Sequence, residues 1–147
     1  MIPVRTAQIP LIQEFTFNFD DTMENTSGVR YTFGSAIVDG ATALLAAQLF
    51  DVMTLPVNAV VVGGEWATET AFDAATYTII VGDSVSANRY LASADLKAVG
   101  RTALLMTGYV SDGLPVRVSI AAADVCTTGK ATLRVMYTIR DRASENA

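Results

Sequence analysis

The polar side chains most able to form a reactive or ligand-binding site lie between residues 81 and 102, in the stretch VGDSVSANRYLASADLKAVGRT. There Asp83 and Asp95 flank Asn88 and Arg89, a set that could act as an acid pair or as a polar ligand cluster. The chain has no histidine and no second nearby acid on a defined strand, so hydrolysis by paired carboxylates has no support. The favoured interpretation is structural: Asp83 accepts backbone hydrogen bonds in a turn, and Arg89 pairs with a carboxylate to pin the connection.

Trp66 is a second candidate, because a flat aromatic ring beside a carboxylate such as Glu65 suits a carbohydrate ring. A lone tryptophan in an apolar strand more commonly packs in the core, here together with Phe72. A carbohydrate site centred on Trp66, or on Asn88 and Arg89, is therefore kept as an alternative.

Composition argues against several other classes of function. The single cysteine, Cys126, leaves no cysteine cluster for zinc, and Asp20, Asp21 and Glu24 lack the spacing of a calcium-binding loop. The formal net charge is −5 and the ten basic residues are dispersed, which disfavours binding along a nucleic-acid backbone. No apolar run approaches the roughly 20 residues needed to cross a bilayer. We therefore expect no metal or other cofactor, no catalysis, no nucleic-acid partner and no membrane span.

Hydrophobic alternation predicts an all-β chain. Phe15, Phe17 and Phe19 share one face of a strand that begins near Glu14, and polar residues share the other. Further candidate strands cover residues 29–34, 35–40, 58–72, 76–82, 101–110, 116–121 and 131–140. Such a series predicts an antiparallel β-sandwich or jelly roll of about eight strands.

Three local features complete the expected fold. Residues 41–53 suit either a helix or a buried strand, with the strand slightly favoured. Ser93 could cap a short helical connector near residues 94–99 that ends at Gly100. The glycine pair at 63–64 predicts a bend or bulge in the longest strand.

The predicted organisation is one domain with two extensions. Residues 1–13 contain two prolines and form an extended N-terminal arm, residues 14–140 form a single β-sandwich domain, and residues 141–147 form a polar C-terminal tail. Hydrophobic residues make up 51% of the chain and charged residues only 17%, so part of the surface is expected to face other protein. The N-terminus does not have the pattern of a signal peptide, which predicts synthesis in a cytoplasm.

The ordered run LPVNAVVVGGEW, VGDS, NRYL, DLKAVGRTAL and GKATLRVMYTIRDR resembles the small cement or decoration proteins of tailed bacteriophages. The resemblance covers roughly residues 10 to 142 and depends on the order and spacing of apolar strands and glycines. Members of this family are jelly-roll proteins on the outside of the capsid, beside the major capsid protein.

The resemblance implies a structural virion protein without enzymatic activity, made in the cytoplasm of a bacterial host. It would bind the outer capsid surface as a homodimer or homotrimer, bridge major capsid protein subunits and stabilise the shell. The expected capsid or subunit interface consists of Ile2, Pro3, Val4, Arg5, Ile9, Pro10, Arg140 and Arg142. The alternative function is a carbohydrate-binding β-sandwich module of a phage tail or surface protein.

Overall fold

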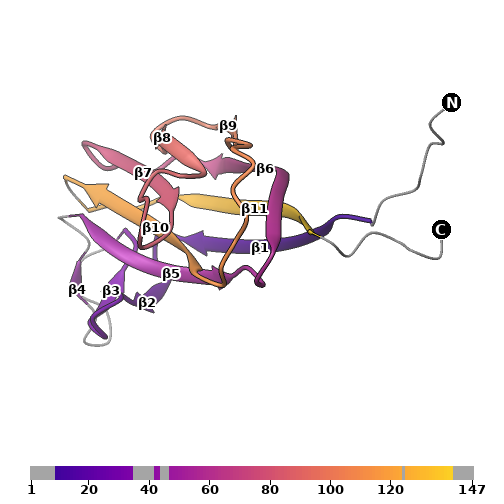
Figure 1. The fold of residues 1–147 in the computed structure, drawn as a ribbon. Helices are drawn as coiled ribbons and strands as arrows, with labels where there is room; N and C mark the ends of the chain where they lie inside the picture. The colour runs from indigo at the N-terminus through magenta and orange to yellow at the C-terminus, as the bar shows by residue number, and fades with distance from the viewer. Residues whose placement is uncertain (1–8, 35–41, 44–46, 124, 141–147) are drawn as a thin grey trace, which may run out of the picture.

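The computed structural model describes residues 9–34, 42–43, 47–123 and 125–140. Within these ranges the chain forms eleven β-strands and no helix, so the predicted all-β class is confirmed. The strands form two four-stranded sheets and one three-stranded sheet, and the two larger sheets are the layers of a sandwich (Figure 1). No helix of a length and hydropathy suited to crossing a membrane occurs among the described residues.

The first large sheet, named here the terminal sheet, has the antiparallel strand order β1-β11-β6-β9. Its strands are β1 (Leu11–Asn18), β11 (Lys130–Ile139), β6 (Ala59–Thr70) and β9 (Gly100–Ala103). The predicted alternation of β1 is present, since Phe17 is buried while Glu14 and Thr16 are exposed. The strand begins at Leu11, so residues 11–13 of the predicted arm belong to the sheet.

The second large sheet, named here the opposite sheet, has the order β5-β10-β7-β8. Its strands are β5 (Gln48–Thr54), β10 (Pro115–Ala122), β7 (Tyr77–Gly82) and β8 (Leu91–Asp95). The small sheet consists of β2 (Thr22–Glu24), β3 (Arg30–Thr32) and β4 (Thr42–Ala43). Within residues 41–53 the structure has β4 and all of β5 except its last residue, Thr54, so the favoured strand is confirmed there, while residues 41 and 44–46 lie outside the described residues.

Aromatic and aliphatic side chains fill the space between the sheets, and the aromatic rings contact one another. The Phe17 ring lies 4.4 Å from that of Phe33 and 5.9 Å from that of Trp66, measured between ring centroids. Phe72 stacks on Tyr77 with centroids 4.4 Å apart. Burying each such side chain contributes about 1.5–3 kcal/mol, so the inward faces of the alternating strands hold the sandwich together.

The predicted bulge in β6 is confirmed next to the glycine pair. The register between β11 and β6 shifts after Met136, which faces Gly63, while the next residue faces Val61. Gly64 has φ +126°, and a Cβ placed on it would lie 2.2 Å from the carbonyl oxygen of Arg134. Only glycine fits here, because both the backbone conformation and the close approach exclude a side chain.

The predicted helical connector near residues 94–99 is wrong. Strand β8 runs to Asp95, and the N–H of Leu96 donates to the carbonyl of Tyr77, which extends the pairing with β7. Asp95 then accepts a hydrogen bond from the N–H of Lys97 and forms a turn. Pairing with β7 buries Ala94 and Leu96 and outweighs the capping signals at either end of the segment.

Candidate interaction surface

Asp83 follows β7 and is held by its own turn and by Arg89. Its side chain is 2% exposed, and Oδ1 accepts hydrogen bonds from the N–H groups of Val85 and Ser86 at 2.9 and 2.8 Å. Oδ2 accepts one from Arg89 Nε at 2.6 Å. Burial raises the pKa of Asp83, but the hydrogen bonds from Arg89 and from the turn outweigh it and leave the pKa below its ordinary value. The predicted structural role of Asp83 and Arg89 is confirmed.

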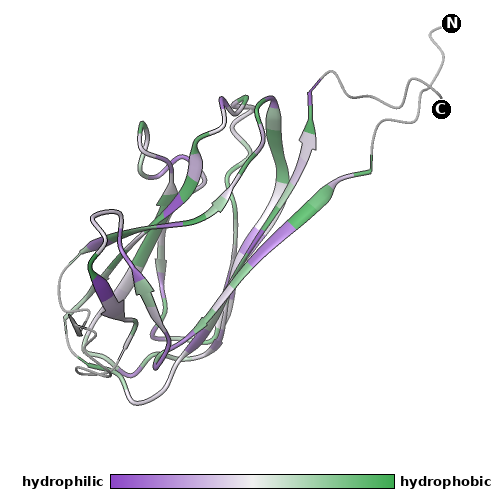
Figure 2. Cartoon of the chain, turned by 90° about the horizontal axis from the view of Figure 1, so that it is seen from below, coloured by the Kyte–Doolittle hydropathy of each residue, from purple (hydrophilic) through white to green (hydrophobic). Residues whose placement is uncertain are grey.

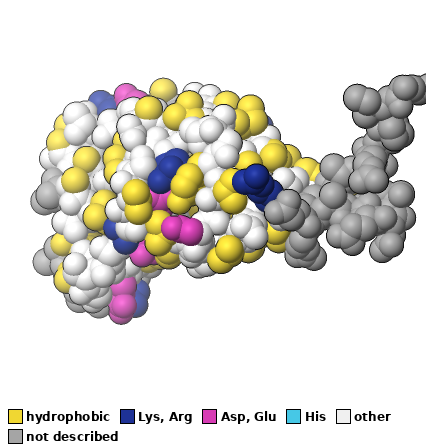
Figure 3. Space-filling model, in the orientation of Figure 1, with side chains coloured by type: hydrophobic (Ala, Val, Ile, Leu, Met, Phe, Trp, Pro, Cys, Tyr) yellow, Lys and Arg dark blue, Asp and Glu magenta, His cyan; other side chains and the backbone are white. Residues whose placement is uncertain are grey.

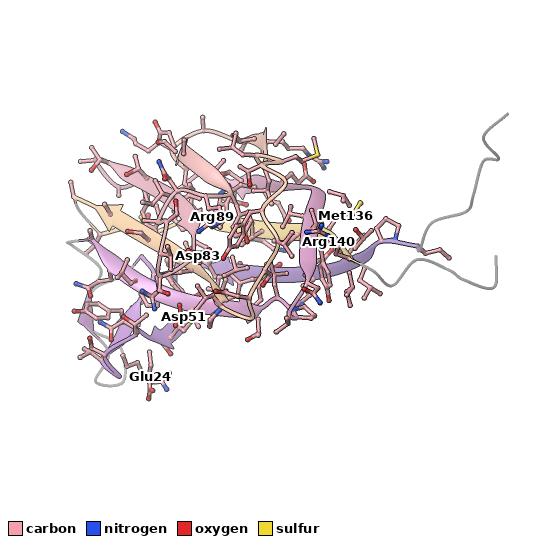
Figure 4. All side chains as sticks on the ribbon, viewed as in Figure 1. Glu24, Asp51, Asp83, Arg89, Met136 and Arg140 are labelled. Carbon is pink, nitrogen blue, oxygen red and sulfur yellow. The ribbon has the colours of Figure 1, made fainter. Side chains whose placement is uncertain are left out.

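Arg89 connects that turn to the loop after β9. Its guanidinium carbon lies 3.5 Å from the centroid of the Tyr109 ring, a cation–π contact, and Figure 4 shows Arg89 close to Asp83. Asp95 faces Thr78, at the start of β7, whereas Asp83 follows the end of that strand. The two carboxylates are therefore roughly 15 Å apart along the hairpin, too far for an acid pair.

Trp66 lies in the core and not at the surface. The residue is 1% exposed, it contacts Phe17, and its Nε1 has no hydrogen-bond partner among the described residues. Asn88 is exposed in the turn between β7 and β8, and the Arg89 side chain is occupied by Asp83 and Tyr109. The structure does not bring these residues together on one surface, and Trp66 cannot stack on a sugar without leaving the core.

The outer face of the terminal sheet carries a row of alternating charges. Glu14 on β1, Arg134 on β11 and Glu65 on β6 face one another in register. Arg134 contacts Glu14 Oε1 at 3.0 Å and Glu65 Oε1 at 3.2 Å, and Arg101 on β9 contacts Glu65 Oε1 at 3.2 Å. The hydrogen bond to Glu14 is the main cause of the raised pKa of Arg134. Each arginine is thus already paired, which leaves this row no free cation for a phosphate.

A hollow of about 480 Å³ lies over this charged row. Ile12 and Met136 line it together with the small residues Gly64 and Ala103. A second hollow, of about 220 Å³, shares Arg101 and Arg134 with the first and extends to Glu69. No cluster of three or more potential metal-binding side chains occurs in the described part of the chain. Apolar side chains beside balanced, paired charges are suited to contact with another protein.

The predicted interface residues fall partly within the described ranges. Ile9 is 85% exposed, and Pro10 and Arg140 are also exposed. The predicted interface residues Ile2, Pro3, Val4, Arg5 and Arg142 lie outside the described residues. Leu11 faces Tyr137 across β1 and β11, so the described ends of the two strands are neighbours at one end of the molecule (Figures 1 and 2).

The sequence analysis missed the charged row because its members are distant in the chain. Glu14 and Arg134 are 120 residues apart, and 36 residues separate Glu65 from Arg101. The one available signal was alternation, which assigns Glu65 and Arg134 to the outward faces of their strands.

The face of the opposite sheet seen in Figure 3 shows few charges among apolar and uncharged side chains, in line with the composition.

No family model matches the chain, and neither does any curated protein. Solved structures with a similar fold include chains from three phage capsids. A chain from the capsid asymmetric unit of cyanophage Pam1 is 20% identical, with a TM-score of 0.55 and coverage of 95% of this chain and 91% of that one. A chain from the acidic stable capsid of Helicobacter pylori bacteriophage KHP30 is 17% identical, with a TM-score of 0.59 and coverage of 90% and 89%. One from the capsid of Ralstonia phage GP4 is 16% identical, with a TM-score of 0.51 and coverage of 95% and 90%.

Proposed function

We propose that this protein is a structural component of a phage virion that binds the outer capsid surface and bridges major capsid protein subunits. One observation carries the proposal: the fold is shared, over at least 90% of this chain, with chains from three phage capsid structures. The resemblance in strand and glycine order to phage cement proteins favours the same role, and the role requires no catalysis.

The end of the molecule where β1 begins and β11 ends is the proposed contact with the shell. Ile9 and Pro10 directly precede β1, and Arg140 directly follows β11, so these exposed residues lie on neighbouring strands. We assign residues 1–10 and 140–142 to this contact, which retains the interface expected from the sequence. A homodimer or homotrimer would present two or three such ends to the shell and strengthen binding without any new contact.

Co-sedimentation with assembled shells tests the proposal. The phage that encodes the chain supplies empty capsids, and light scattering gives the solution mass of the free protein. We expect a discrete oligomer that sediments with the shells. A monomer that stays in the supernatant would contradict the proposal.

A truncation locates the contact. Removal of residues 1–10 spares β1, which begins at Leu11, so the variant should keep its β-sheet circular dichroism and its cooperative melting. We expect it to bind shells at least about tenfold more weakly. Removal of residues 143–147, which contain no predicted interface residue, is the matched control and should not weaken binding. Full binding after loss of residues 1–10 would exclude the arm.

A further inference from the structure

No described strand pairs with the outer edge of β1, and the hydrogen-bond pattern identifies the open groups of that edge. In an antiparallel pair, alternate residues bond to the neighbouring strand, and those between them direct N–H and C=O to the other side. The N–H of Phe19 donates to the carbonyl of Gly129, which fixes the odd-numbered residues of β1 as those bonded to β11. The backbone groups of Ile12, Glu14 and Thr16 therefore face away from β11.

The open stretch ends at Asn18. Its N–H donates to Asp21 Oδ2 at 2.7 Å, and its carbonyl accepts the N–H of Asp21 at 3.1 Å. No described residue bonds to the backbone groups of Ile12, Glu14 or Thr16 on the open side. Three consecutive open positions can form two hydrogen bonds each with an added strand.

The outer strands of the opposite sheet have backbone carbonyls that already accept hydrogen bonds from other segments. The carbonyls of Leu49 and Thr54, near the ends of β5, accept hydrogen bonds from the N–H of Thr26 and from Gln13 Nε2. The register of β8 with β7 is irregular, and the carbonyl of Tyr90, just before β8, accepts the N–H of Leu105.

The two edges of the terminal sheet differ from each other. At its far side, β9 has only four residues. In contrast, β1 pairs with β11 over eight residues without a register shift, and its sequence has no proline or lysine, the usual protection of an edge.

The side chains along this edge indicate the chemistry of a partner strand. Ile12, Glu14 and Thr16 point to the outer face, and on the paired side they meet Met136, Arg134 and Thr132 in register. Within the molecule, the apolar, acidic and hydroxyl side chains of β1 are thus already matched by an apolar, a basic and a hydroxyl side chain of β11. Glu14 keeps 54% of its side chain exposed beside Arg134, so a second cation can still approach it.

The same charge disfavours a second copy of β1 as the occupant. A two-fold antiparallel pairing that engages all three open residues places Glu14 opposite the second copy's Glu14, and like charges directly opposite destabilise a sheet. If the register of the two β1 strands is shifted by one open position in either direction, one of the three open residues no longer faces an open residue of the second copy.

We propose that an extended segment of the capsid shell protein adds to β1 as a fifth strand of the terminal sheet and places a basic residue opposite Glu14. This inference rests on the proposed function and names the sheet edge that contacts the shell. The backbone supplies the hydrogen bonds, and the outward side chains set the register.

A proline substitution at Thr16 tests the edge, because it removes an outward N–H without removing a bond to β11. Asp95→Pro is the matched control: Leu96 donates its N–H to the carbonyl of Tyr77, so the N–H of Asp95 points away from β7 at an edge of the opposite sheet. Thr16→Val controls for the lost hydrogen bond to the Thr132 hydroxyl. We expect Thr16→Pro to bind shells at least about tenfold more weakly and both controls to stay within about twofold of wild type. Should Thr16→Pro fail to fold, Ile12→Pro applies the same test.

Each outcome has a distinct meaning. Equal shell binding by wild type and Thr16→Pro would overturn the edge inference and leave the proposed function standing. Failure of wild type itself to bind shells would overturn both. A wild-type oligomer that Thr16→Pro dissociates would identify a second copy as the occupant and overturn our assignment of a shell segment. Glu14→Lys should weaken shell binding as well, and unchanged binding would refute the basic residue opposite Glu14.

Discussion

Replacement of Asp83 is the sharpest test of how the stretch 81–102 is built. The carboxylate accepts three hydrogen bonds, one of them from Arg89, and the two side chains are 2% and 16% exposed. Asp83→Ala removes all three acceptor contacts and leaves Arg89 without its anion. Asp83→Asn keeps an oxygen for the N–H groups of the turn, but it removes the charge and replaces the oxygen that accepts from Arg89 with an NH2 group.

The stability lost on replacement of Asp83 follows from the burial of its ion pair with Arg89. Loss of one partner from a buried ion pair costs about 3–5 kcal/mol, and a hydrogen bond to a charged group contributes about 1.5–3 kcal/mol. Arg89 keeps some exposure and its contact with Tyr109, so Asp83→Ala should lower the free energy of unfolding by about 3 kcal/mol. Asp83→Asn should cost about 1–2 kcal/mol.

Urea denaturation at several pH values measures the free energy of unfolding of wild type, Asp83→Ala and Asp83→Asn. The pKa of Asp83 in the folded chain lies below its ordinary value of 3.8, so its ionisation stabilises the fold fully above that value. The stabilisation is lost as the pH falls through the lower folded-state pKa. The difference between wild type and Asp83→Asn should therefore be largest at neutral pH and shrink below about pH 4.

Asp95→Ala is the matched control, since Asp95 is an exposed aspartate in the same hairpin with one backbone contact, to Lys97. It should cost less than about 1 kcal/mol. A cost for Asp83→Ala no larger than that of the control, or a difference from Asp83→Asn that does not change with pH, would refute the structural role of the carboxylate.

Two further substitutions test the core and the bulge. Gly64→Ala should destabilise the fold by more than about 2 kcal/mol in thermal or urea unfolding, whereas Gly100→Ala, with open space around the added carbon, should be near neutral; equal effects would refute the steric account. Trp66→Ala should cost about 3–5 kcal/mol and leave glycan-array binding unchanged from wild type; a stable variant that loses glycan binding would restore the carbohydrate alternative.

The fold class could be predicted because hydrophobic alternation is a local signal. Phe15 and Phe17 predict the inward face of β1, and the glycine pair predicts a bulge in β6. Neither prediction requires knowledge of the partner strand. The helical connector failed for a related reason. Ser93 and Gly100 are local capping signals, but the decisive interaction is the pairing of β8 with β7, which local sequence does not reveal.

The candidate surface could not be predicted because it is a product of strand order. Glu14, Arg134, Glu65 and Arg101 form one row only after β1, β11, β6 and β9 are placed side by side, and that order is not sequential. The Asp83 turn could be anticipated, because an aspartate that accepts hydrogen bonds from the next few N–H groups is encoded within a few residues.

The N-terminal arm and the open edge of β1 form one continuous segment of chain. Ile9 and Pro10 lead directly into β1, and Pro10 has no N–H, so the first outward donor next to the arm is that of Ile12. A shell segment bonded along this edge would draw its affinity mainly from backbone groups, which any sequence with the same strand geometry provides. Contact of this kind depends on the strand geometry of the fold and on few particular side chains. Proline at position 16 should therefore weaken shell binding far more than valine does. Both substitutions change the side chain, but only proline removes the N–H.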